Sequence, residues 1–92
     1  MIFGEIQSQK HYSKFYPELL RFVSRHFKNV EAGIQGDAWI YVSKEGQSVD
    51  LDTFTSMNFE VKAQATSRSL AFEVLEVLGK KFNVVVHPNE EE

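Results

Sequence analysis

The spacing of apolar residues changes twice along this chain, and these changes limit its fold more than any other feature. Apolar residues recur with the 3.6-residue period of a helix over residues 13–28 and again over about 66–79. Between these segments, residues 38–64 alternate apolar and polar side chains with the two-residue period of strands. Such alternation is typical of an antiparallel sheet with one covered face. The pattern predicts an α+β fold in which two amphipathic helices pack on one face of a mainly antiparallel four- to five-stranded sheet.

The first helix is predicted over residues 13–28. Ser13 can cap its start, and Pro17 fits a first turn, where a missing N–H costs least. Its apolar arc separates almost completely from its charged arc on a helical wheel. The residues of the apolar arc, which we expect in the core, are Tyr12, Phe15, Tyr16, Leu19, Leu20, Phe22, Val23, His26 and Phe27.

The second helix is predicted to start near Thr66, Ser67 or Ser69, because each of these side chains can cap a helix. It should end at Gly79 or Asn83, both of which accept a left-handed cap conformation. The stripe that we expect to face the core comprises Leu70, Ala71, Val74, Val77 and Leu78.

A hairpin is predicted between the helices, with strands over 38–43 and 48–54 and a turn at 44–47. Pairing Val42 with Val49 sets aliphatic side chains opposite each other. A slip by one residue is the alternative, and it would turn every side chain of one strand to the other face. In the favoured register, the polar face of the hairpin carries Trp39, Tyr41, Asp50 and Asp52. A third strand is predicted within residues 57–64.

The remaining segments have weaker patterns. Residues 2–7 are a candidate strand, and residues 29–37 contain the glycines of a connection with at most one short strand. The run 84–86 is all valine, which predicts a strand buried on both faces and ended by Pro88. The expected order is candidate strand, helix, candidate strand, three strands, helix and strand. Residues 1–88 are expected to form a single domain, and residues 89–92 a flexible acidic tail.

Composition excludes several classes of protein. The chain has no cysteine, so it can form neither a disulfide framework nor a thiolate metal site. No run approaches the roughly eighteen apolar residues that span a bilayer, and we expect a cytoplasmic protein that does not act at a membrane. The three histidines lack metal-ligand spacing, and no phosphate-binding or nucleophile motif is present, so neither a metal nor a cofactor is predicted.

The polar face of the hairpin is the leading candidate for a binding site. Two large aromatic side chains, Trp39 and Tyr41, lie there on an otherwise polar surface, and aromatic residues are enriched in binding hot spots. With Asp50 and Asp52 they predict a non-enzymatic protein-interaction or regulatory module, with a homodimer as one form of it. The two aspartates could also hold a divalent cation, but a solvated strand face explains them more simply.

Two other function classes stay open. His26 is expected to be a partly buried core histidine, and the alternative is a small ligand-binding domain or enzyme with a cleft near His26 and the connection at residues 33–37. Nucleic-acid binding through the basic side of the first helix is a weaker alternative. Residues 1–28 carry five basic and two acidic side chains, whereas the rest carries five basic and eleven acidic ones. Enzyme activity has no positive support.

Overall fold

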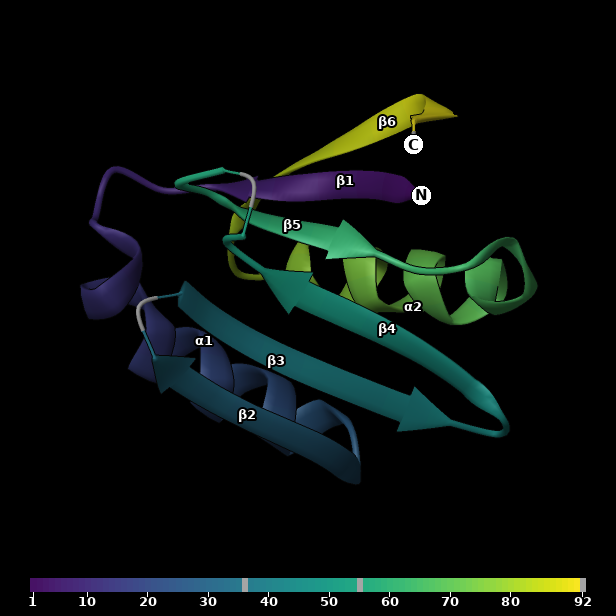
Figure 1. Ribbon diagram of the computed structural model, residues 1–92, viewed down its shortest axis with the longest axis horizontal. Helices are drawn as coiled ribbons and strands as arrows, with labels where there is room; N and C mark the ends of the chain where they lie inside the picture. Colours follow the sequence, from purple (N-terminus) through teal and green to yellow (C-terminus); the bar gives the residue numbers. More distant parts are fainter. Residues whose placement is uncertain (36, 55, 92) are drawn as a thin grey trace.

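The computed structural model describes residues 1–35, 37–54 and 56–91, which form one antiparallel sheet and two helices (Figure 1). The α+β prediction is confirmed, with more strands than expected because both candidate strands are present. The elements in chain order are β1 (Ile2–Gln7), α1 (Tyr12–His26), β2 (Asn29–Gln35), β3 (Asp37–Lys44), β4 (Gln47–Asp52), β5 (Phe59–Lys62), a short 3-10 turn (Ala65–Ser67), α2 (Arg68–Leu78) and β6 (Asn83–Glu91).

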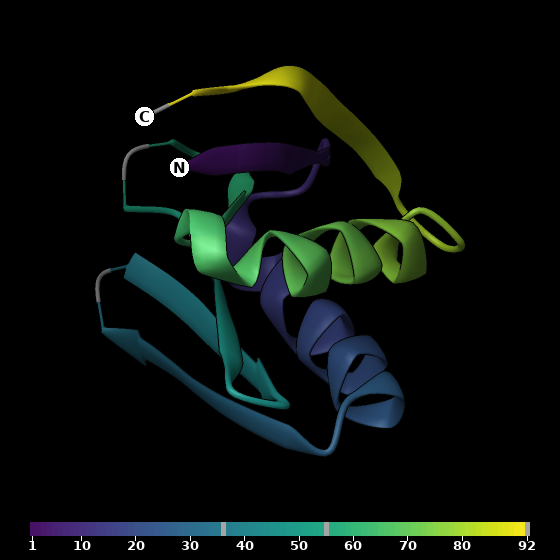
Figure 2. The same ribbon diagram turned by 90° about the vertical axis from the view of Figure 1, so that its right-hand side faces the viewer.

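The strand order across the sheet is β2-β3-β4-β5-β1-β6, and each neighbouring pair is antiparallel. The N-terminal strand β1 therefore lies between β5 and β6, although these two are linked through α2 along the chain. Strands β5 and β6 are both antiparallel to β1 and so run parallel to each other, and α2 connects them. As predicted for such a crossover, α2 covers the same face of the sheet as α1. In Figure 1 they lie behind the strands, and the turned view in Figure 2 shows α1 to one side of β2 and β3.

The predicted hairpin register is confirmed, with Val42 opposite Val49 and Ile40 opposite Leu51. These side chains face the helices and are completely buried. Because successive side chains of a strand point to opposite faces, every second residue in this part of β3 and β4 places an apolar side chain in the core. The largest fully buried side chains are Phe3, Phe59, Ile6, Leu19, Ile40, Leu51, Leu78, Val23, Val42, Val49, Val61 and Val74.

Gly4 allows α2 to pack closely against β1. A Cβ atom at this position would lie 2.6 Å from the carbonyl oxygen of Val85 and 2.8 Å from the Cδ2 atom of Leu75. Real Cβ atoms do not approach backbone oxygen so closely, so only glycine fits here. The backbone of β1 thus lies directly beneath the helix that connects β5 to β6.

The start of α1 differs from the predicted one, whereas α2 starts after Ser67, one of the predicted cap residues. His11, not Ser13, is the cap residue of α1, and its Nδ1 atom accepts a hydrogen bond from the Ser13 backbone N–H at 3.3 Å. Ser67 occupies the cap position of α2, but its side chain makes no capping bond there. Instead the Gln47 side chain, from the far end of the hairpin, accepts the Leu70 N–H at 2.8 Å. Tertiary structure supplies a cap that the local sequence does not.

The prediction for the valine run was wrong. β6 is an edge strand, and Val85 and Val86 are 37% and 48% exposed. Pro88 does not end the strand, which continues to Glu91. An edge strand tolerates proline because one side of its backbone has no ladder partner. The flexibility of residues 89–92 stays a prediction, and Glu92 lies outside the described residues.

Among the residues that the structure describes, no helix is both long enough and apolar enough to cross a membrane. The cytoplasmic location stays a prediction.

Candidate functional site

The sheet face opposite the helices, here called the open face, carries Trp39 and Tyr41 from the central strand β3. The two rings are stacked, with centroids 4.6 Å apart and planes inclined by 28°. Both side chains are half-buried. Because the N-terminal segment is itself a strand of the sheet, it does not cover them. The structure thus leaves a large stacked aromatic surface in contact with solvent.

Gly33 on the neighbouring strand β2 makes room for the indole ring. It pairs directly with Trp39, and a Cβ atom there would lie 2.4 Å from the ring atom Cζ2. The indole therefore lies against bare backbone, which fixes one side of the aromatic pair. Sequence reasoning missed this role because it interpreted residues 29–37 as a connection. The glycine inside an alternating segment was the available signal.

Asp52 is not an available binding group. Its side chain is only 4% exposed, and its Oδ1 atom lies 2.8 Å from the Nζ atom of Lys62. The same oxygen accepts a hydrogen bond from the backbone N–H of Phe54 at 3.3 Å. A buried carboxylate with a cation and a backbone donor is satisfied internally. Asp52 holds β4 to β5 and to the loop that follows β4.

Asp50 differs from Asp52 although both lie on the open face of β4. It is exposed and lies opposite Tyr41 on one side and Lys62 on the other. Partial desolvation, together with the charge of Asp52, raises the pKa of Asp50 despite the opposing effect of Lys62. On the other side of Tyr41, β2 places the exposed Glu31 in the equivalent position. Tyr41 therefore stands between two carboxylates.

The open face as a whole is acidic. Among strand residues with described side chains, the register places one lysine there, Lys62, and six acidic residues: Glu5, Glu31, Asp37, Asp50, Asp52 and Glu60. A shallow hollow of about 320 Å³ lies beside Asp50 and Lys62, where β4 starts and β5 ends. Within the described part of the chain, no group of three or more histidine, aspartate or glutamate residues could hold a metal ion.

His26 is not the core histidine expected from the helical wheel. It is the last residue of α1 and is exposed, with its ring 4.5 Å from that of Phe22. Its Nδ1 atom lies 2.9 Å from the carbonyl oxygen of Phe22, one turn back along the helix. This hydrogen bond places the proton on Nδ1 in the neutral ring and leaves Nε2 as an acceptor. The next residue, Phe27, is buried in the core, so the exposure of His26 is local to the last position of the helix.

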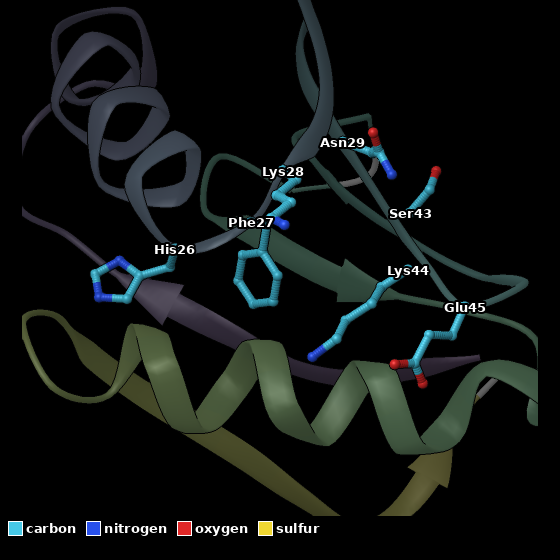
Figure 3. A pocket seen from close by; sticks show the side chains of 7 residues that line it. All are labelled: His26, Phe27, Lys28, Asn29, Ser43, Lys44 and Glu45. Atoms are coloured by element: carbon cyan, nitrogen blue, oxygen red, sulfur yellow. The ribbon is translucent and has the colours of Figure 1, made fainter.

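A cavity of about 420 Å³ lies beside His26, between the end of α1 and the β3–β4 hairpin. Figure 3 shows the Phe27 ring and the Lys44 side chain pointing toward α2. Lys44 is bound to Glu73 of that helix at 2.7 Å, and this hydrogen bond raises the pKa of Lys44. The lining residues are His26, Phe27, Lys28, Asn29, Ser43, Lys44 and Glu45. Gly33, Ile34 and Asp37, which belong to the connection expected near this cleft, are not among its lining residues, and Gly36 lies outside the described residues.

The basic side of α1 is a separate surface. Lys14, Arg21, Arg25 and Lys28 are all exposed, as expected for the solvated side of an amphipathic helix. Glu18 interrupts them and forms ion pairs with Lys10 at 3.4 Å and Lys81 at 3.7 Å. The residues predicted to bind a partner all lie on the open face: Trp39, Tyr41, Asp50 and Asp52. His26 and the basic surface of α1 lie elsewhere.

No protein-family model, curated protein or solved structure matches this chain. What it binds must be inferred from its own surface.

Proposed function

We propose that this protein is a small non-enzymatic interaction module that binds a protein partner through its open face. The observation that supports this most is the stacked pair of Trp39 and Tyr41, which remains solvent-accessible on an otherwise charged sheet surface. Aromatic side chains of this kind supply much of the binding energy at protein interfaces and lose little side-chain entropy there. The strand that carries them is paired on both sides, with β2 and with β4, so little backbone ordering is needed on binding.

The charge of the open face favours a different protein over a second copy of this one. Two open faces pressed together would bring six carboxylates on each side toward each other, with one lysine on each side to offset them. Juxtaposed like charges oppose association, whereas complementary charge selects a partner and accelerates encounter. Homodimerisation through this face is therefore the less favoured form of the proposal. We expect the partner to be a cytoplasmic protein.

A double variant, Tyr41→Ala with Asp50→Ala, tests the proposal because it removes an aromatic and an available charge but spares the internal Asp52–Lys62 pair. The matched control is Glu76→Ala with Lys80→Ala, two exposed residues on the helix side. Tagged wild type and both variants would be compared by quantitative affinity capture and by light scattering. We expect the open-face variant to lose proteins that the wild type and the control retain. Equal capture by all three folded proteins would refute the proposal.

The cavity beside His26 supports a second candidate function, the binding of a small molecule. Its volume, about 420 Å³, falls within the range of ligand pockets, and charged and amide groups line it. An amide-detected NMR screen with a small-metabolite library would test this candidate. It predicts shifts confined to residues 26–29 and 43–45. Absence of such shifts for every compound would count against the cavity as a ligand site.

A further inference from the structure

Building on the proposed function, we infer that the row formed by Glu31, Tyr41 and Asp50 on the open face binds an arginine side chain of a basic protein segment. The three residues lie directly opposite one another on β2, β3 and β4. Side chains in such positions have Cβ atoms roughly 4.5–5.5 Å apart on each strand pair. The row therefore brings an aromatic ring and two carboxylates within the reach of one ligand group.

The carboxylates of this row are available. Glu31 and Asp50 are both exposed, and neither accepts a hydrogen bond from, or forms an ion pair with, another residue in the described part of the chain. The parallel row through Trp39 differs, because it has Gly33 at one end and the internally neutralised Asp52 at the other. Charge complementarity therefore places a cation at Tyr41 and not at Trp39.

A guanidinium group fits this row better than an ammonium group. It is planar and weakly hydrated, so it stacks on an aromatic ring while donating hydrogen bonds from its edges. Its several N–H donors can serve carboxylates on both sides of the ring at once. A lysine ammonium is a strongly hydrated point charge that satisfies only part of this arrangement. Because Trp39 lies against the other side of Tyr41, the aromatic support is continuous.

The source of the arginine is expected to be another protein. The basic side of α1 in a second copy also presents Arg21 and Arg25, but docking it on the open face would be a head-to-tail contact. Such contacts do not close on themselves unless the rotation between copies happens to form a ring, and they lead to open chains. Growth of the particle mass with concentration would reveal that outcome and overturn the assignment to a different protein.

Fluorescence anisotropy with labelled peptides tests the inference. The probes are three nine-residue Gly-Ser-Xaa repeats in which Xaa is arginine, lysine or citrulline. We expect the arginine peptide to bind at least about tenfold more tightly than the citrulline peptide, and several-fold more tightly than the lysine peptide. In the variant Glu31→Gln with Asp50→Asn, affinity for the arginine peptide should fall by at least about tenfold.

The matched control is Glu45→Gln with Glu76→Gln, which removes the same number of charges from exposed positions outside the row. It should keep the affinity within about twofold, since these charges act only at long range. An equal loss in the control, or equal binding of lysine and arginine peptides, would show non-specific attraction and overturn the inference. If no peptide binds while the Tyr41 and Asp50 variant still loses captured partners, the inference fails and the proposed function stands. If capture is also unchanged, both fail.

Discussion

Asp50 and Asp52 stand two residues apart on one strand, yet their surroundings give them different roles. Asp52 is neutralised by Lys62 and accepts a backbone N–H, so it belongs to the framework. Asp50 keeps its charge exposed to solvent but partly desolvated and close to Asp52. Holding an ionised carboxylate in these surroundings destabilises the folded state. Such a destabilising group is typical of functional sites.

The first prediction concerns Asp50 and pH. Because its pKa is raised in the folded protein, its ionisation opposes folding, and this penalty is fully present above the folded pKa and disappears as pH falls through it. Asp50→Asn should therefore unfold at a higher temperature than the wild type at pH 7. The difference should shrink between pH 7 and pH 3. Circular dichroism melting of both proteins at these pH values measures it, and a wild type that melts higher at pH 7 would contradict it.

Gly33 provides a second prediction, since Trp39 is the chain's sole tryptophan and reports on its own environment. Gly33→Ala would place a methyl group within the indole ring's present position, so the ring must move away from β2. The emission spectrum and near-ultraviolet circular dichroism of Trp39 should change. The cost in stability should be small, because the end of a half-exposed side chain can shift.

The control for Gly33 is Gly79→Ala, at the end of α2. A Cβ atom there would make only ordinary contacts, of 3.4 Å and 3.6 Å, and the backbone is already right-handed helical. Alanine at such a position is neutral or stabilises by about 0.4–1 kcal/mol. Its Trp39 emission should match the wild type. An unchanged spectrum in Gly33→Ala would show that the indole does not rest on the β2 backbone.

At the scale of elements, the start of α2 depends on the β3–β4 hairpin. The side chain of Gln47 accepts the Leu70 N–H at 2.8 Å, and the hydroxyl of Ser67 accepts the Ser48 N–H at 3.0 Å. These bonds fasten a helix end to a hairpin end far from it in sequence. The hairpin that presents the open face is thus also anchored from behind.

Gln47→Ala should lower the free energy of unfolding by about 0.5–2 kcal/mol, the usual value of a helix cap. Urea denaturation followed by far-ultraviolet circular dichroism measures this loss. Gln64→Ala is the control, because Gln64 is exposed and makes no capping bond at the 3-10 turn that follows it. Equal stabilities of the two variants would mean that the Gln47 contact contributes nothing.

The elements that sequence predicted well are those whose partners lie next to them in the chain. The register of β3 with β4, and hence the shared face of Trp39, Tyr41, Asp50 and Asp52, follows from alternation and a short turn. The position of β6 does not, because β1 inserts between β5 and β6 from the other end of the chain. A short run of valines has the same sequence pattern in an edge strand as in an inner strand of a sheet.

The candidate site, like the fold, could be predicted only in part from the sequence. Period-two alternation identifies which side chains share a face, but not which of them neutralise each other. The pairing of Lys62 with Asp52 depends on the register of β4 with β5, and the contribution of Glu31 depends on β2 being a regular strand. The helical wheel placed His26 in the core because a wheel does not show whether other elements cover the last position of a helix.

On the scale of the whole molecule, the fold separates two surfaces of opposite character. The helices and the core occupy one side of the sheet, and α1 presents exposed basic residues there. The open face on the other side is acidic and carries the aromatic pair. Such a charge distribution orients an approaching basic partner toward the open face before contact.

The most direct test of the open face as the binding surface is amide chemical-shift mapping during titration with the arginine peptide, or with a protein recovered by affinity capture. We predict that the shifted amides cluster on β2, β3 and β4 around Glu31, Tyr41 and Asp50, together with the indole N–H of Trp39. Shifts confined to α1, or to residues 26–29 and 43–45 around the His26 cavity, would contradict the account.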